Sequence, residues 1–288
     1  MLLRDDFVSL LVRRPPCLLL RQAWLSCLLF TAYLAAAQTP ADSYKPVPGQ
    51  PGKDVVWIPT PDATLDKMLD MAKVTREDYV IDLGSGDGRM VIAAAKRGAR
   101  AHGVEFNPDL VVLSQRAAVA AGVADKATFS QGDMFEADIS RATVMPLFLL
   151  PNHLNTLAAK FLRLKPGSRV VSNTYEIGGG WEPDETVRTE LCLSWCIAHL
   201  YVVPARAAGY WRLGEGVSLT LEQHYQQVYG SYQIDGVAVA IENGRLRGEE
   251  ISFTVNNAVY SGRVSGNTMT GTAHGRTKRE WQATRVSE

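Results

Sequence analysis

Residues 79–89 read YVIDLGSGDGR, and this stretch decides the fold. The apolar run at 79–83 predicts a buried strand, the glycines after it predict a tight turn, and the apolar spacing at 88–97 predicts a helix. Because a glycine has no Cβ, the backbone of such a turn can approach a ligand closely. The order of strand, glycine-rich turn and helix therefore indicates a ligand site at the carboxyl end of a parallel strand.

A second strand, at 101–105, leads into the motif GVEFNP, which spans residues 103–108. This strand carries Glu105 to the same edge of the sheet, where its carboxylate can accept hydrogen bonds from a ribose diol. A dinucleotide fingerprint requires a third glycine where this chain has Arg89. The acid in the first strand, Asp82, would repel a pyrophosphate but suits an ammonium group. These residues predict a nucleoside ligand that has an ammonium group and no phosphate.

Further segments carry a resemblance to a known family. They are WIPTP at 57–61, QGDMFEADIS at 131–140, LFLLPN at 147–152, LKPGSRVVSNTY at 164–175 and GGGWEPDE at 178–185. With these motifs the chain resembles the class I, seven-stranded methyltransferases. Within that class it is similar to the lysine methyltransferases that modify the mitochondrial ATP synthase c subunit and the adenine nucleotide carrier. The alternative is a Rossmann-like domain whose glycines serve only packing, or a catalytically inactive relative.

The resemblance implies S-adenosylmethionine as the cofactor and assigns residues to it. Those for the methionine part are Asp82, Gly84, Gly86 and Gly88, with Thr60 closing over the carboxylate. Glu105 takes the ribose hydroxyls, and Phe106 packs on the adenine. Asp133 accepts from the adenine amino group, with Met134 beside it. The implied reaction is a direct in-line methyl transfer to an amino group of a protein acceptor, that of lysine.

The acceptor side carries a weaker signal. Many amino-group methyltransferases have Asp/Asn-Pro-Pro-aromatic after the fourth strand, whereas residues 149–152 read LLPN, which resembles the lysine-methylating subgroup. A lysine must lose its proton before it accepts a methyl group, helped by an apolar pocket or by a nearby carboxylate. The candidates for that pocket are Tyr175, Glu176 and Trp181, and packing of a loop is the alternative role for each. The sequence identifies no catalytic residue beyond these candidates.

The first 37 residues read as a secretory signal peptide. Arginines at 4–21 precede an apolar run at 23–34, which ends in three alanines at 35–37. We therefore expect an exported protein, periplasmic or in the cell envelope, and tethered to the membrane if the leader is not cleaved. S-adenosylmethionine is made in the cytoplasm, so three resolutions stay open. The enzyme works outside, translation starts further downstream, or the domain is a non-catalytic scaffold in the envelope that binds a cofactor-like ligand or a protein.

The remaining chain divides by pattern. Residues 38–54 are rich in proline and glycine and predict an extended tether. Residues 55–204 alternate strands and helices, which predicts a Rossmann-like, seven-stranded α/β methyltransferase sheet. Its helices are expected to start with Thr60 as the N-cap before Pro61, and with Asn107 before Pro108. Residues 210–288 alternate with period two, with turns such as Asn243-Gly244, and predict a small antiparallel β barrel or sandwich whose aromatic residues fill and rim its core.

Composition limits the partners. The chain has 30 basic and 30 acidic residues, so its formal net charge is zero and it lacks the basic footprint of a nucleic-acid-binding protein. We expect a monomer with no bound metal. On one continuous strand, Cys192 and Cys196 would lie about 13 Å apart, too far for a disulfide, whereas a hairpin turn between them would permit one. Two buried thiols are the expectation for this pair.

Overall fold

The computed structural model describes residues 44–53, 55–190 and 192–287. The signal peptide expected at residues 1–37 lies outside these ranges. Every helix and strand of the described residues lies within residues 46–288. No helix in the described ranges is both long enough and apolar enough to cross a membrane.

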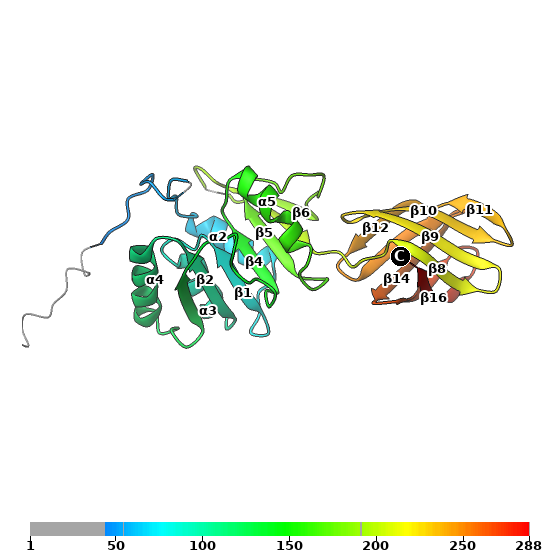
Figure 1. Ribbon diagram of the computed structural model, residues 1–288, viewed down its shortest axis with the longest axis horizontal. Helices are drawn as coiled ribbons and strands as arrows, with labels where there is room; N and C mark the ends of the chain where they lie inside the picture. The colour runs from blue at the N-terminus through cyan, green and yellow to red at the C-terminus, as the bar shows by residue number, and fades with distance from the viewer. Residues whose placement is uncertain (1–43, 54, 191, 288) are drawn as a thin grey trace, which may run out of the picture. The chain divides into compact units, whose positions relative to one another are not determined.

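Seven strands form a sheet in the order β3-β2-β1-β4-β5-β7-β6 (Figure 1). Strands β1 to β5 are parallel, and β7 runs antiparallel to both of its neighbours. Their bounds are β1 Tyr79–Leu83, β2 Arg100–Glu105, β3 Ala127–Gln131, β4 Val144–Leu147, β5 Arg169–Asn173, β6 Glu185–Arg188 and β7 Ile197–Val202. This is the expected methyltransferase sheet, and its strand order reverses between β1 and β4.

Alternate residues of the strands build two apolar cores, one on each face of the sheet. Val80 belongs to the core beneath the helices α2 (Asp62–Met71), α3 (Arg89–Lys96) and α4 (Pro108–Ala120). Ile81 and Leu83 belong to the core beneath α5 (Pro151–Phe161). Because helices cover both faces, a ligand reaches this sheet at the ends of its strands.

Two helix starts test the capping predictions. Asn107 caps α4 by accepting a hydrogen bond from the Asp109 backbone N–H at 2.9 Å, and Pro108 takes the first helical position, as predicted. Helix α2 instead has Pro61 at its N-cap, without a side-chain cap, so the capping role predicted for Thr60 is wrong. Pro61 is extended, with ψ 140°, and therefore the helix begins one residue later.

Part of the segment predicted to be an extended tether folds back on itself. The Gly49 N–H donates to the Trp57 carbonyl at 2.8 Å, and the Trp57 N–H donates to the Gln50 carbonyl at 2.9 Å. Pro51 and Val56 form an isolated antiparallel bridge. The described residues of 47–57 are therefore a short hairpin, and the prediction of an extended chain is wrong for residues 47–53. We call this segment the N-terminal hairpin.

Cys192 and Cys196 form a disulfide, with their Cα atoms 5.6 Å apart. Strands β6 and β7 pair antiparallel, with Arg188 opposite Ile197, so both cysteines lie in the connection between them. The hairpin turn that a bridge requires is therefore present, and the expectation of two free thiols is wrong.

The C-terminal strands close into an eight-stranded antiparallel barrel (Figure 1), because β9 pairs with both β8 and β10. The short β11 adds to β10 outside this ring. The bounds are β8 Gly209–Gly214, β9 Val217–His224, β10 Gln227–Ile234, β11 Val237–Ala240, β12 Glu242–Arg247, β13 Glu250–Val255, β14 Ala258–Ser265, β15 Thr268–His274 and β16 Lys278–Ser287.

Aromatic side chains fill the interior of the barrel, as predicted. The Phe253 and Tyr260 rings stack with centroids 4.9 Å apart, and Trp281 packs on both rings at 5.9 Å. The turn predicted at Asn243-Gly244 is wrong, because both residues lie inside β12 at a register shift. A Cβ on Gly244 would come within 2.0 Å of the Val228 carbonyl oxygen, so this glycine serves close strand contact.

Candidate cofactor and acceptor site

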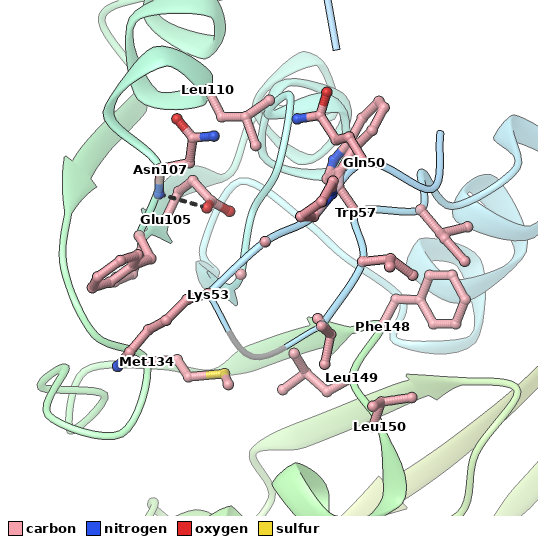
Figure 2. A pocket seen from close by; sticks show the side chains of 18 of the residues that line it. Gln50, Lys53, Trp57, Glu105, Asn107, Leu110, Met134, Phe148, Leu149 and Leu150 are labelled. Carbon is pink, nitrogen blue, oxygen red and sulfur yellow. Dashed lines mark hydrogen bonds between the residues drawn. The ribbon is translucent and has the colours of Figure 1, made fainter. Parts of the chain in front are cut away.

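A cavity of about 240 Å³ opens at the carboxyl ends of the parallel strands, on both sides of the point where the strand order reverses. Open α/β sheets bind ligands at such a point. Figure 2 shows Glu105 and Asn107 on one side of the cavity and Phe148, Leu149 and Leu150 on the other. The cavity therefore has a polar end after β2 and β3, and an apolar end after β4.

The glycine-rich turn shapes the base of this site. Gly84, Gly86 and Gly88 have φ values of 72°, 55° and 78°, a backbone conformation that other residues adopt rarely. Gly84 lines the cavity. A Cβ on Gly86 would lie 2.5 Å from Trp57 Nε1, so the N-terminal hairpin packs directly on the turn.

Glu105 is held in place by the turn that it faces. Its carboxylate accepts hydrogen bonds from the Gly86 N–H and the Asn107 N–H, both at 2.9 Å. Each oxygen of a carboxylate has a second lone pair, so Glu105 can still accept from two ligand hydroxyls. Its fixed position at the end of β2 fits the predicted role toward a ribose diol.

Asp82 lies buried beneath the turn, only 6% exposed. Burial, together with the negative charges of Glu105 and Asp87, raises the pKa of the Asp82 carboxyl well above its ordinary value. Arg89 pairs with Asp87, through hydrogen bonds from Nε at 3.0 and 3.1 Å and from Nη2 at 2.8 Å, and it leaves Asp82 without a cation. The cluster of acids is therefore short of positive charge, and a ligand that brings an ammonium group would supply it.

Asp133 and Phe106 are both in contact with Lys53. The Lys53 ammonium lies 2.6 Å from Asp133 Oδ2 and 4.7 Å from the centroid of the Phe106 ring. Asp133 Oδ1 accepts from the Phe135 N–H at 2.9 Å. The Lys53 hydrogen bond is the largest of several influences that lower the pKa of Asp133. The N-terminal hairpin thus places a lysine between the two residues that were assigned to the adenine.

The apolar end of the cavity is lined by Phe148, Leu149, Leu150, Tyr175 and Trp195. Trp195 comes from the disulfide-closed connection between β6 and β7, and its ring centroid lies 5.5 Å from that of Phe148. Tyr175 is the one acceptor candidate from the sequence that the structure places in this wall.

The other two acceptor candidates are corrected by the structure. Glu176 is exposed and outside the lining of the cavity. Trp181 is 1% exposed in the apolar core on the α5 side of the sheet, with its ring stacked on Tyr225 of the barrel at 5.9 Å and edge-on to Tyr201 at 5.2 Å. A large aromatic ring that is buried in this way stabilises the fold through the apolar surface that it removes from water, so Trp181 has a packing role.

The cofactor candidates divide in the same way. Those that line the cavity are Gly84, Glu105, Phe106, Asp133 and Met134, and those that are buried outside its lining are Thr60, Asp82, Gly86 and Gly88. Sequence reasoning missed Lys53 and Trp195, and it gave no role to Trp57 of the WIPTP motif. Lys53 and Trp195 reach the site from segments without a motif, and an aromatic residue between two cysteines was the only usable signal.

The residues present fit S-adenosylmethionine and do not fit a dinucleotide. Among the described lining residues Lys53 is the only basic side chain, and it is paired with Asp133, so a pyrophosphate would meet no free cation. The acids at 82 and 105 suit an ammonium group and a diol.

Comparison with known proteins agrees with this chemistry. Residues 82–185 match the family described as the ANTKMT methyltransferase domain. A protein-lysine N-methyltransferase of Saccharolobus islandicus is 43% identical over 139 residues, which cover 47% of this chain and 86% of that protein. The human lysine N-methyltransferase of the ATP synthase c subunit is 33% identical, over 49% of this chain and 61% of that protein. This chain therefore spans less than two thirds of the human relative.

A solved RNA methyltransferase from Salinibacter ruber, in complex with S-adenosyl-L-homocysteine, is 44% identical. The match covers 52% of this chain and 96% of that one, with a TM-score of 0.49.

The seven-stranded sheet and the site at its reversal point define a class I methyltransferase with S-adenosylmethionine as its cofactor. The chain belongs to the family that includes the protein-lysine N-methyltransferase of Saccharolobus islandicus. The alternative of a non-catalytic envelope scaffold has no support in these relatives.

Proposed function

We propose that the protein methylates the side-chain amine of lysine in a protein acceptor. The observation that carries this proposal is the apolar and aromatic end of the cavity, opposite the end that carries Glu105 and Asp133. An extended aliphatic chain that ends in an amine fits such an end. The names of the relatives, which include methyltransferases of protein lysine, support the same acceptor.

When bound, S-adenosylmethionine supplies a methyl group that is already activated. The protein then needs mainly to align the acceptor nitrogen with that methyl group and to exclude water. Leu149 is 5% exposed, and Leu150 is partly exposed beside it at the start of α5. These leucines offer an apolar path from solvent toward the turn at Gly84, where a Cβ would lie 3.4 Å from Leu149 Cδ2.

The acceptor amine must lose its proton before transfer, and a nearby carboxylate is one means of removing it. Among the described lining residues the carboxylates are Glu105 and Asp133, which follow β2 and β3, away from the leucines. Glu176, the carboxylate considered from the sequence, is outside the lining. Of the two means of deprotonation considered from the sequence, a carboxylate at the acceptor end therefore has no support among the described lining residues.

A transfer assay tests the proposal. The full chain is incubated with methyl-labelled S-adenosylmethionine and envelope proteins, and labelled residues are identified by mass spectrometry. A parallel sample has its lysines blocked by acetylation. We expect methyl-lysine only in the unblocked sample, and less of it with Glu105→Ala when S-adenosylmethionine is limiting. Label on another residue type, or equal label after acetylation, would overturn the lysine assignment.

We also propose that the enzyme acts in an exported, periplasmic or cell-envelope location. The pattern at residues 23–37 supports this location, and so does the Cys192–Cys196 disulfide, because disulfides persist in oxidising compartments. Sequencing the N-terminus of the native protein and fractionating the cell test it together. An uncleaved protein in the cytoplasmic fraction would contradict the location and leave the lysine assignment untouched.

A further inference from the structure

The connection between β6 and β7 brings a tryptophan to the acceptor end of the cavity. The Cys192–Cys196 disulfide closes this connection around Leu193, Ser194 and Trp195. Leu193 is fully exposed, whereas Trp195 turns the other way and lines the cavity. Because the disulfide joins residues only four apart, it restricts the directions in which Trp195 can point.

The backbone of Trp195 is held in an unfavourable conformation. Its φ is +60°, in the left-handed region that bulky residues rarely occupy. Thr174, just before Tyr175, has a φ of +67°. The two segments are joined, since the Thr174 N–H donates to the Ile197 carbonyl at 2.7 Å. Left-handed residues of this kind persist where the surroundings impose them, and they cluster at binding sites.

Three aromatic rings from three separate connections meet at this end of the cavity. Trp195 lies 5.5 Å from Phe148 and 6.3 Å from Tyr175 between ring centroids, with tilts of 56° and 52°. Rings tilted in this way form walls that meet at an angle rather than a stack. Faces of aromatic rings attract cations, most strongly where no water competes and where the face belongs to tryptophan.

We propose that Trp195, Phe148 and Tyr175 form an aromatic cage for the positively charged acceptor nitrogen, and that the Cys192–Cys196 disulfide positions Trp195 in it. This inference rests on the proposed lysine acceptor. As the acceptor nitrogen forms its bond to the methyl carbon, the bond from that carbon to sulfur breaks and the positive charge moves to nitrogen. The faces of the three rings then stabilise the positive charge on the nitrogen. Methylated ammonium groups are weakly hydrated, so the cage selects them over neutral groups of the same shape.

Equilibrium binding tests the cage without turnover. Two probes are titrated into the full chain saturated with S-adenosylhomocysteine, followed by calorimetry and tryptophan fluorescence. They are the methylamide of N-acetyl-trimethyl-lysine and its uncharged analogue, in which carbon replaces the ammonium nitrogen. We expect the charged probe to bind about tenfold more tightly. Trp195→Leu removes this preference, Trp195→Phe keeps most of it, and Ser194→Ala, a matched change in the same loop, leaves it unchanged.

The paired variant Cys192→Ser with Cys196→Ser tests the role of the disulfide. We expect the preference for charge to fall about threefold or more, while affinity for S-adenosylhomocysteine stays within twofold, which shows that the fold persists. Equal binding of the two probes by the native protein, no measurable binding of either, or an unchanged preference in Trp195→Leu would overturn the cage. An unchanged preference in the cysteine variant would overturn the role of the disulfide.

The two proposals fail separately. If methyl-lysine forms in the transfer assay but Trp195→Leu keeps its preference for charge, only the cage is wrong. If the probes reveal a cage and no methyl-lysine forms with any acceptor, the cage stands and the lysine assignment is wrong.

Discussion

The seven-stranded sheet and the C-terminal barrel distribute their charged groups differently. The sheet buries the carboxylates of Asp78 and Asp82, which are 7% and 6% exposed. In the described part of the barrel, every charged side chain is at least partly exposed, and Ser218 and Gln226 are its buried polar residues. Burying a charge costs free energy unless a partner compensates it. The sheet therefore carries a cost that the barrel avoids.

The difference shows where each region does its work. Asp78 has its partners within the protein, whereas Asp82 lacks a nearby cation and lies beneath the cofactor turn. An uncompensated buried acid is a mark of a functional site. The barrel encloses an aromatic core, and its described residues include no uncompensated buried acid, so its buried residues serve stability. Its function, if it binds a partner, belongs to its surface.

The largest expected effect comes from removing Asp78, the buried acid that has a charged partner. Asp78 accepts hydrogen bonds from the Thr75 N–H and the Thr143 hydroxyl, each at 2.8 Å, and is paired with Arg169. Asp78→Ala leaves Arg169 unpaired and should lower the free energy of unfolding by about 3–5 kcal/mol. Glu249→Ala, the barrel control, removes an exposed pair with Arg263 and should cost about 0–1 kcal/mol. Urea denaturation compares them, and equal costs would contradict the contrast.

The same pair gives a pH dependence. Burial alone would raise the pKa of Asp78, but the hydrogen bonds from Thr75 and Thr143 and the charge of Arg169 outweigh it, and the pKa lies below its ordinary value. A lowered pKa contributes stability above the pKa of the unfolded chain, about 3.9, and this stability is lost as the pH falls through the folded value. The stability difference between the native protein and Asp78→Asn should therefore shrink only below about pH 4.

A second prediction concerns cofactor affinity. Glu105→Ala removes the carboxylate that the turn holds in place, and should weaken binding of S-adenosylmethionine by about 10–150-fold. Glu280→Ala removes an exposed carboxylate of the barrel and should leave affinity unchanged. Calorimetry measures both. A loss below threefold for Glu105→Ala would mean that the ribose is held elsewhere.

The uncompensated acid predicts proton release. The raised pKa of Asp82 should fall when a cationic ligand binds near it, so affinity should decrease as the pH drops through the raised value, by up to about tenfold per pH unit. Calorimetry in buffers that differ in ionisation enthalpy counts the protons released. Asp82→Asn should bind more weakly and without this pH dependence. A profile for the native protein that stays flat at every pH above the ordinary pKa of an aspartate would contradict it.

Two glycines sharpen the comparison further, because they share a conformation. Gly86 has φ +55° and Gly266, in a barrel turn, has φ +58°. A Cβ on Gly86 would meet Trp57, whereas one on Gly266 meets nothing within 4 Å. Both alanine variants should lose about 1 kcal/mol of stability from backbone strain, and Gly86→Ala should lose more because its Cβ would meet Trp57. Gly86→Ala alone should weaken cofactor binding, by about tenfold, and equal affinities of the two variants would show that the contact with Trp57 is irrelevant.

Local chemistry explains which features could be predicted from the sequence. The strand, the glycine turn and Glu105 are close together in the chain, and each has a residue type that its role demands. The barrel was predicted from alternation, but the turn at Asn243-Gly244 was misplaced, because a glycine serves a bulge as well as a turn. The alternating pattern did not distinguish a barrel from a sandwich. The two differ in whether β9 pairs with β10, and alternation does not specify which strands pair.

The missed residues share a physical reason. Lys53 and Trp195 reach the cavity only because the N-terminal hairpin and the β6–β7 connection fold over the strand ends. The disulfide was missed for the same reason. The turn in the β6–β7 connection brings the two cysteines close enough to bond, and their spacing in the sequence does not reveal that turn. Trp181 was misassigned because a glycine-rich loop with an aromatic residue has the same pattern at a pocket and at a packed contact with the barrel.

The smallest expected effect comes from removing the barrel. Every described residue that lines the cavity lies between 50 and 195, so the barrel supplies none of them. We propose that residues 38–207 fold alone and bind S-adenosylmethionine within about twofold of the full chain. Their stability should fall, because Trp181 loses Tyr225 and the Glu182 carbonyl loses the Gln226 side chain, which donates to it at 2.7 Å. Tyr225→Ala in the full chain measures that contact separately. Loss of binding by a truncated protein that circular dichroism shows to be folded would mean that the barrel completes the site.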